Sequence, residues 1–304
     1  MKFTDPDVTA KGEPRARVDL TKLETLWLNT GTLCNIQCDH CYIESSPTND
    51  RLVYLTLDDV RVYLDEIAET GLATRQIGIT GGEPFMNPDI MPILELILER
   101  GFELLVLTNA MKPMEHKSEA LQKLHARFGS QIVLRISVDH FTQEMHEEER
   151  GKNTWQPMIK GLKWLSANGF TIDVAGRTRW NENEQDLRQG FAQLFQQLDV
   201  KVEAQNPSEL MLFPEMDEGA DVPEITTACW DILSVDPKDM MCATSRMVVK
   251  RKGADKPAVL ACTLLPYDKA FEMGSTLKQA SGGVKLNHPH CAKFCVLGGG
   301  SCSA

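Results

Sequence analysis

The sequence predicts an α/β fold: a partial (β/α)6 barrel of the TIM type, followed by a small Cys-rich β-hairpin domain. Short apolar runs alternate with amphipathic stretches over residues 24–214, which is typical of parallel strands covered by helices. About six strand–helix units in roughly 190 residues favour an incomplete barrel over a closed eightfold one. After residue 214 this alternation stops, and the chain becomes rich in glycine, turn residues and cysteine.

Capping residues and glycines mark the predicted helices. Thr56 is a suitable N-cap, because two aspartates follow it in the first turn, and Gly71 is a suitable C-cap. Asn87 is predicted to cap the next helix, with Pro88 at the first helical position. The predicted helices cover residues 57–71, 88–101, 118–129, 154–169 and 184–198. The predicted strands cover residues 26–29, 76–80, 104–107, 132–138, 172–175 and 210–213.

The region after the barrel reads as a separate small unit. Residues 247–250 and 259–263 are predicted to form a hairpin around the turn at 253–255. We therefore expect an N-terminal extension (1–23), a core barrel (24–220) and an auxiliary domain (221–304). The auxiliary domain has few apolar residues, so we expect bound metal to help it fold.

Composition limits the possible partners. A formal net charge of −11 argues against binding a nucleic-acid backbone. The sequence has no apolar stretch long enough to span a membrane, and residues 1–17 lack the apolar core of a signal peptide. We therefore expect a cytoplasmic protein without nucleic-acid or membrane partners. In a reducing compartment, nine cysteines in tight groups indicate metal ligands or redox chemistry rather than disulfides.

The most informative group of cysteines follows the first predicted strand of the barrel. Cys34, Cys38 and Cys41 stand in a C-x3-C-x2-C arrangement, so three thiolates can converge on one metal centre. That loop contains no fourth cysteine. Three protein ligands on an iron–sulfur cluster leave one iron free to bind another molecule, and an open metal position is typical of catalytic sites.

Unusual residues also follow the other predicted strands. In a β/α barrel the active site lies at the carboxyl ends of the strands. Gly81, Gly82 and Glu83 follow the second strand, and Thr108 and Asn109 end the third. Ser137 and Asp139 lie at the end of the fourth strand, and Arg177 follows the fifth. We therefore expect these side chains to surround the cysteine loop.

At this point the chain resembles the radical SAM superfamily, whose members use S-adenosylmethionine and a [4Fe–4S] cluster. The cysteine loop has that family's spacing, and Gly81-Gly82-Glu83-Pro84 has its Gly-Gly-Glu-Pro motif after the second strand. The resemblance covers roughly residues 24–214. It implies that Cys34, Cys38 and Cys41 bind the cluster and that its free iron chelates the amino and carboxylate groups of S-adenosylmethionine.

The resemblance also suggests which residues bind S-adenosylmethionine. It implies that Gly81, Gly82 and Glu83 hold the methionine amino group, and that His40 lies near the adenine. Asn109, at the end of the third strand, is a further cofactor-binding candidate.

Three further candidates suit the same cofactor chemically. Ser137 and Asp139 would suit the ribose hydroxyls, and the planar fork of Arg177 would suit the methionine carboxylate.

Simpler interpretations of the same residues stay open. Ser137 can be a hydrogen-bonded core hydroxyl, and Asp139 can cap the following turn. Arg177 can form a surface ion pair, and Asn109 can serve only turn geometry. The three-cysteine loop can also hold a structural zinc ion. The charge-dense segment 140–150 is interpreted as a solvated helix start rather than as a part of the site.

The tail contains a second set of cysteines. Cys242 and Cys262 flank the predicted hairpin, Cys291 and Cys295 follow as a close pair, and Cys302 comes after three glycines. This arrangement resembles the twitch or shortened SPASM extension of some radical SAM enzymes, which implies an auxiliary [4Fe–4S] cluster held by four of the five. Cys242 and Cys302 compete for the fourth place. A zinc ribbon is the alternative, and His288 and His290 can also ligate.

These features together predict a radical SAM enzyme. An external reductant such as flavodoxin or ferredoxin would supply one electron, and S-adenosylmethionine would be cleaved to a 5′-deoxyadenosyl radical that abstracts a hydrogen atom from substrate. We expect a small molecule or a peptide as the substrate. The segment before residue 26 is too short for a leader-binding domain, so we expect a small molecule at least as much as a peptide. The alternative is a non-catalytic electron carrier or metal-handling protein, but a carrier has no use for the glycine motif.

Overall fold

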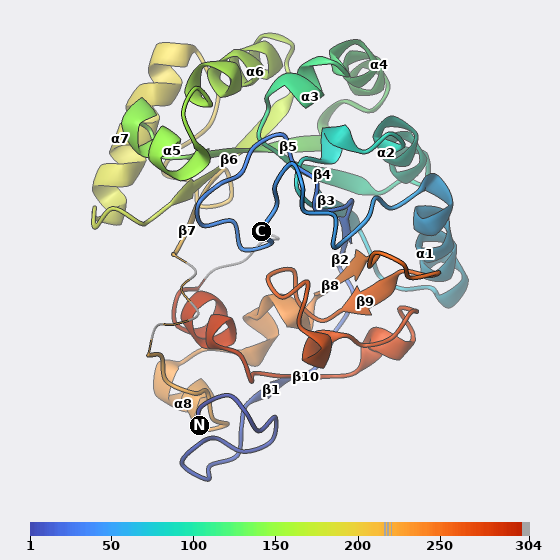
Figure 1. Cartoon of the computed structure of the whole chain (residues 1–304), viewed down its shortest axis with the longest axis vertical. Coiled ribbons are helices and arrows are strands. Elements are labelled where there is room, and N and C mark those ends of the chain that lie inside the picture. Colours follow the sequence, from blue (N-terminus) through green and yellow to red (C-terminus); the bar gives the residue numbers. More distant parts are fainter. Residues whose placement is uncertain (216, 218, 220, 300–304) are drawn as a thin grey trace.

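A single curved sheet organises the chain in the computed structural model, which describes residues 1–215, 217, 219 and 221–299. Its eight strands follow the order β7-β6-β5-β4-β3-β2-β8-β9. Adjacent strands from β2 to β7 are parallel, β8 pairs parallel with β2, and β9 pairs antiparallel with β8. Figure 1 shows the helices of the barrel region on the outside of the curve and the C-terminal region on the inner side. The predicted fold class is confirmed.

The barrel strands begin and end close to the residues predicted from the sequence. The strands are β1 (Arg17–Val18), β2 (Thr25–Asn29), β3 (Gln76–Thr80), β4 (Glu103–Thr108), β5 (Ile132–Asp139), β6 (Thr171–Arg177), β7 (Leu210–Phe213), β8 (Ser245–Val249), β9 (Ala258–Leu260) and β10 (Val284–Lys285). The α-helices are α1 (Leu57–Thr70), α2 (Ile90–Glu99), α3 (Lys112–Glu115), α4 (Ser118–Phe128), α5 (Gln143–Arg150), α6 (Trp155–Ala167), α7 (Glu184–Leu198) and α8 (Cys229–Leu233).

Helix α1 begins and ends as its sequence predicts. The Thr56 hydroxyl accepts a hydrogen bond from the Asp59 backbone, and the Asp59 carboxylate accepts one from the Thr56 backbone. This reciprocal pair satisfies two N–H groups that the first helical turn leaves without partners. Gly71 ends the helix with φ of 65°, a left-handed conformation that glycine adopts without steric cost.

The predicted start of α2 is wrong. Asn87 does not cap the helix, which begins at Ile90 with Asp89 in the N-cap position. A short 3-10 turn, Pro84–Met86, precedes it. The Asn87 amide donates to the Leu55 carbonyl at 2.9 Å, and its side-chain oxygen accepts from the Asp89 backbone. The side chain is therefore used to hold this turn against the segment before α1.

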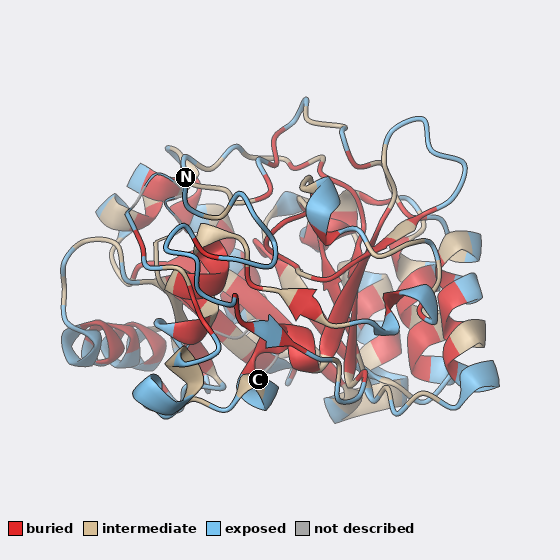
Figure 2. Cartoon of the chain, turned by 90° about the horizontal axis from the view of Figure 1, so that it is seen from below, coloured by how far each residue is buried: buried red, intermediate tan, exposed pale blue. Residues whose placement is uncertain are grey.

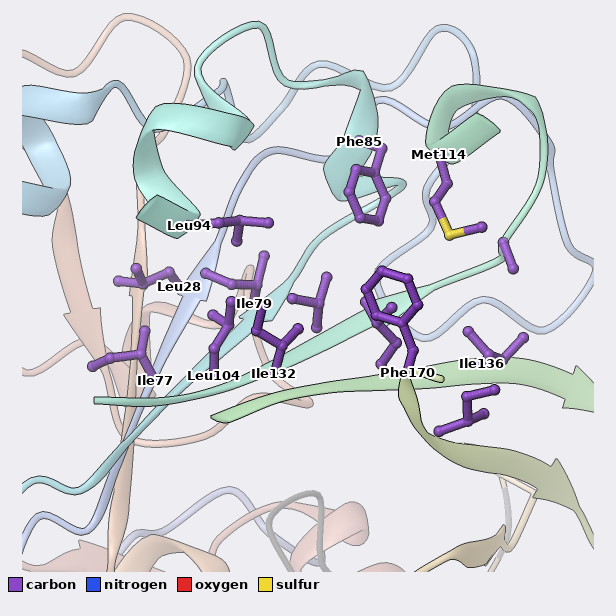
Figure 3. Packing of buried hydrophobic residues seen from close by; sticks show 14 of the residues in the cluster. Leu28, Ile77, Ile79, Phe85, Leu94, Leu104, Met114, Ile132, Ile136 and Phe170 are labelled. Carbon is purple, nitrogen blue, oxygen red and sulfur yellow. The ribbon is translucent and has the colours of Figure 1, made fainter. Parts of the chain in front are cut away.

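Both faces of the sheet are buried, which explains the nearly continuous apolar sequences of its strands (Figure 2). Leu26 and Leu28 of β2 pack in the core between sheet and helices, whereas Trp27 packs in the second core with Met247. This alternation is the period of two expected for a strand. Figure 3 shows the outer core, where residues such as Leu28 and Ile79 lie below Leu94 of α2.

The regions expected to flank the barrel are joined to it and to each other. The β8–β9 hairpin extends the barrel sheet beyond β2. The N-terminal strand β1 pairs with β10, and Arg15 forms a buried ion pair with Glu224 at 2.6 Å. The predicted three-part division stays a prediction, and the second core draws on all three parts. Within the described residues, no helix is long and apolar enough to cross a membrane.

The close approach of β2 and β3 should depend on the glycine at position 78. A Cβ there would lie 2.4 Å from a ring carbon of Trp27, which is buried in the second core. We expect Gly78→Ala to lower the free energy of unfolding by about 1–3 kcal/mol, because the ring cannot move without displacing its neighbours. Urea unfolding measures this change. Gly282→Ala is the matched control, since a Cβ there meets no atom closer than 3.6 Å. Equal effects of the two substitutions would contradict the packing argument.

Candidate functional site

One pocket at the carboxyl ends of the parallel strands brings together most of the predicted site residues. It has a volume of about 110 Å³ and includes Ile36, Tyr42, Thr108 and Arg150 in its lining. The predicted residues that line it are Cys34, Cys38, Cys41, Gly81, Gly82, Asn109, Ser137 and Arg177. These residues come from the loops or ends of five different strands, as expected for a barrel of this type.

The glycine motif packs directly against the segment that leads into the cysteine loop. The Gly82 backbone N–H donates to the Gly31 carbonyl at 2.8 Å, and the Glu83 N–H donates to the Leu33 carbonyl at 3.1 Å. A Cβ on Gly82 would lie only 2.2 Å from the Leu33 carbonyl oxygen. The second glycine is therefore required by the approach of two backbone segments, in addition to any close approach of a ligand.

The carboxylate of Glu83 joins the end of β3 to the end of β4. It accepts hydrogen bonds from the Thr108 hydroxyl at 2.9 Å, the Asn109 backbone at 2.9 Å and the Phe85 backbone at 3.1 Å. Complete burial raises the pKa of Glu83 to about 7, although these hydrogen bonds favour the charged form. The described geometry gives Glu83 a positioning role, and its contact with the methionine amino group stays a prediction.

Asn109 connects the end of β4 to the cysteine loop. Its side-chain amide donates to the side-chain oxygen of Asn35 at 2.9 Å and lies 3.9 Å from the Cys34 sulfur. Its side-chain oxygen accepts from the Met111 backbone, which is turn chemistry as well. Asn109 therefore holds the loop at its first cysteine whether or not it also contacts a cofactor.

Asp139 is occupied by two arginines. Arg150 Nε lies 2.6 Å from one carboxylate oxygen, and Arg177 Nε lies 3.3 Å from the other. Burial would raise the pKa of Asp139, but the two guanidinium groups hold it below its usual range. Asp139 has φ of 58° at a register shift of β5, a left-handed conformation that aspartate tolerates better than most residues. Its predicted contact with a ribose hydroxyl stays a prediction, as does that of Ser137.

The interpretation of segment 140–150 as a solvated helix start is wrong. In α5 the side chains of His146, Glu149 and Arg150 are buried or largely buried, and Arg150 lines the pocket beside the cysteines. Positions 146, 149 and 150 share one face of a helix, since residues three and four apart are neighbours there. This spacing was the sequence signal for Glu149 and Arg150, but the high density of charge obscured it.

Glu149 fixes the cysteine loop to the strand-end arginines. Its side chain is 0% exposed. One carboxylate oxygen accepts a hydrogen bond from the His40 backbone at 3.1 Å, and the other lies 3.0 Å from Nδ1 of the His40 ring. The guanidinium groups of Arg177 and Arg179 pair with the same carboxylate. Arg177 also donates to the His40 carbonyl at 3.2 Å. His40, predicted near the adenine, is therefore anchored from two sides, and Arg177 is not a surface ion pair.

The thiols of Cys34 and Cys38 need a nearby positive charge to ionise, and the iron ions of a cluster would supply it. Burial raises the pKa of the Cys34 thiol to about 12 and that of Cys38 to about 11, so the thiols need bound metal to ionise. Among the described residues, no three His, Cys, Asp or Glu side chains converge tightly enough to hold a single metal ion. In an iron–sulfur cube each thiolate binds a different iron, so its ligands need not converge on one point. Three thiolates are a suitable donor set for three irons of such a cluster.

Four tail cysteines gather around a second, apolar pocket. Cys242, Cys262, Cys291 and Cys295 all line it, together with His290 and several apolar side chains. Cys291 and Cys295 lie in a π-helical turn, Cys291–Val296. Burial raises the pKa of Cys291 to about 12 and that of Cys242 to about 11. Cys302 lies outside the described residues. Four sulfur atoms and an apolar lining fit the donor set of a second iron–sulfur cluster.

Replacing Glu149 should loosen the cysteine loop. We expect Glu149→Gln to lower the free energy of unfolding by about 3–5 kcal/mol, because the change removes the fully buried anion that Arg177 and Arg179 share. Less iron should also be retained per chain after anaerobic reconstitution. Glu148→Gln is the matched control, because Glu148 is 48% exposed and its loss should cost less than about 0.5 kcal/mol. Similar unfolding midpoints and iron contents for the two variants would refute this role of Glu149.

Comparison of the sequence with known proteins identifies the family of this chain. The Radical SAM superfamily profile matches residues 28–186, a segment that contains the cysteine loop and the glycine motif. The subtilosin biosynthesis protein AlbA of Bacillus subtilis is 32% identical over 143 residues, which are 47% of this chain and 30% of AlbA. The GTP 3′,8-cyclase of Tolumonas auensis is 28% identical over 166 residues, which are 54% of this chain and 47% of the cyclase. The chain thus spans less than half the length of these curated relatives.

Solved structures share the fold at low sequence identity. Streptococcus suis SuiB bound to S-adenosylmethionine superimposes with a TM-score of 0.60 and 13% identity, covering 84% of this chain and 63% of SuiB. The protein anSMEcpe with bound AdoMet gives a TM-score of 0.62 and 13% identity, covering 85% of this chain and 77% of that protein. The matched segment spans more than half of the present chain and includes both motifs. The chain belongs to the radical SAM superfamily, whose proteins bind a [4Fe–4S] cluster and S-adenosylmethionine.

Proposed function

We propose that this protein is an enzyme that cleaves S-adenosylmethionine reductively and uses the resulting radical to abstract a hydrogen atom from substrate. The single observation that carries the proposal is the pocket shared by Cys34, Cys38, Cys41, Gly81 and Gly82. When bound, the cluster and S-adenosylmethionine supply the electron transfer and the 5′-deoxyadenosyl radical. Flavodoxin or ferredoxin would be a suitable electron donor.

The chain's own residues would bind and orient the cofactor. Cys34, Cys38 and Cys41 would ligate the cluster. Arg177 faces the pocket with a planar cationic group, which suits the methionine carboxylate. Burial of the pocket among apolar side chains such as Ile36 and Leu107 would keep water from the reactive centre.

The relatives favour a peptide as the substrate. AlbA is a bacteriocin biosynthesis protein, and SuiB has been solved bound to its precursor peptide SuiA, with a TM-score of 0.61 to this chain. We therefore place a ribosomal peptide ahead of a small molecule. The GTP 3′,8-cyclases keep the small-molecule alternative open, because they match a similar share of this chain.

Cleavage of S-adenosylmethionine tests the proposal directly. We expect the anaerobically reconstituted protein to form 5′-deoxyadenosine when dithionite and S-adenosylmethionine are added, measured by liquid chromatography. Cys38→Ala should abolish the product, since only two ligands of the cluster remain. Added precursor peptides should raise the yield more than added nucleotides if the substrate is a peptide. No 5′-deoxyadenosine from a protein with full iron content would refute the catalytic function and favour an electron carrier.

We further propose that the four tail cysteines that share the second pocket hold an auxiliary [4Fe–4S] cluster, with Cys242 as the fourth ligand. The wild-type chain should then bind about eight irons, and Cys242→Ser should lose about four of them while retaining the first cluster. Cys302→Ser should keep all of them. Cys229→Ser is the control, because Cys229 lies outside that pocket and interacts with Thr226. About four irons in the wild-type protein, or zinc in place of the additional iron, would contradict the auxiliary cluster.

A further inference from the structure

A buried arginine beside the tail cysteines has no carboxylate partner in the described part of the chain. The Arg246 side chain lies on β8, and the residue is 1% exposed. Its guanidinium donates four hydrogen bonds, to the carbonyls of Ala280, Cys242, Ser245 and Gly282, at 2.6–2.9 Å. These acceptors are all neutral. A buried cation is costly unless an anion compensates it, so this arrangement calls for a nearby negative charge.

The groups that can supply this charge are the tail cysteines. Arg246 donates to the backbone carbonyl of Cys242, and within the described residues the ionisable side chains that favour its charged form are those of Cys242 and Cys262. Both cysteines line the second pocket. Cysteine binds metal as the thiolate, so loading that pocket with metal places negative charge next to the guanidinium. Among the groups that the structure describes, the thiolates formed on metal binding are therefore the anions available to this cation.

Arg246 differs in this respect from the other buried arginines near the two pockets. Arg150 pairs with Asp139, and Arg177 pairs with Asp139 and Glu149. Arg15 pairs with Glu224. Each of these cations is paired with a carboxylate of the protein itself, whereas no carboxylate in the described part of the chain pairs with Arg246.

We propose that Arg246 is the electrostatic partner of the auxiliary cluster and raises its reduction potential; this inference rests on the proposed cluster. A [4Fe–4S] cluster with four thiolate ligands is anionic and gains one more negative charge on reduction. A fixed cation bound to the backbone of one of its ligands stabilises the reduced form more than the oxidised form, since Coulomb attraction grows with the charge. In an apolar pocket that attraction is weakly screened. Arg246 thus poises the cluster to accept an electron.

A pair of substitutions separates charge from hydrogen bonding. Arg246→Lys keeps the cation, and Arg246→Gln removes it, while both side chains can still donate to carbonyls. The measurements use the full chain with Cys34, Cys38 and Cys41 replaced by alanine, so that only the auxiliary cluster contributes to the EPR signal. We expect the Gln variant to hold about tenfold less reduced cluster at a fixed applied potential, which corresponds to 59 mV for a one-electron couple. The Lys variant should stay nearer to the wild type.

Arg188→Gln is the control for a distant buried arginine, because Arg188 donates to the carbonyls of Ala204 and Leu210, pairs with Glu184 and lies at the other end of the sheet. It should not change the potential. An unchanged potential in Arg246→Gln with the cluster retained would overturn the proposal. Loss of the cluster in both Arg246 variants would also overturn it, because it would assign a structural role. Loss in the Gln variant alone supports the need for charge.

The inference and the proposed function can fail separately. If the wild-type chain binds only about four irons, the auxiliary cluster is absent and the role of Arg246 falls with it. In that case, formation of 5′-deoxyadenosine would still test whether the cysteine loop of the barrel cleaves S-adenosylmethionine. If the wild-type chain binds about eight irons and the potential does not respond to position 246, only the inference about Arg246 is refuted.

Discussion

The whole site depends on how an irregular loop is held in place. The three cysteines lie between β2 and α1, in a segment without helix or extended strand, so no ladder of backbone hydrogen bonds fixes their positions. Two buried carboxylates do so instead. Glu83 organises the strand ends beside the first cysteine, and Glu149 binds the backbone of His40, next to the third. Three ligands must meet one cluster within tenths of an ångström, so these contacts decide whether the loop can bind it.

The use of Glu149 has a cost that the surrounding residues offset. A fully buried carboxylate is unfavourable unless it is paired, and Glu149 is paired with Arg177 and Arg179. Arg177 is shared with Asp139, which also binds Arg150. The result is a network of charges in which the pocket-facing arginines are positioned before any ligand arrives. Preorganised charges of this kind need not reorganise when an anionic group binds.

Local sequence signals were sufficient for the barrel. The strands have apolar runs that are buried on both faces, and α1 has a complete cap at Thr56 and Gly71, so periodicity and capping determine these elements. The prediction that Asn87 caps α2 failed because its side chain instead donates to the Leu55 carbonyl, a contact between segments far apart in sequence. The same limit explains Glu149 and Arg150. From the sequence alone, their charges predict solvent exposure. In the structure, cationic side chains and the cysteine loop cover that face of α5.

The two cysteine sets differ in how the protein treats nearby positive charge. Beside the first set, Arg150 pairs with Asp139 and Arg177 pairs with Asp139 and Glu149, so these carboxylates reduce the net field of the two cations at the cysteines. Beside the second set, the acceptors that the described part of the chain offers Arg246 are neutral carbonyls. A cation compensated by a carboxylate acts mainly as a positioning group. A cation compensated by nothing but a bound cluster changes the energy of that cluster's charge states. The sequence does not distinguish an arginine that positions other groups from one that tunes a cluster, because both are single arginines on or beside a strand. The distinction comes from which acidic residues the fold leaves within reach.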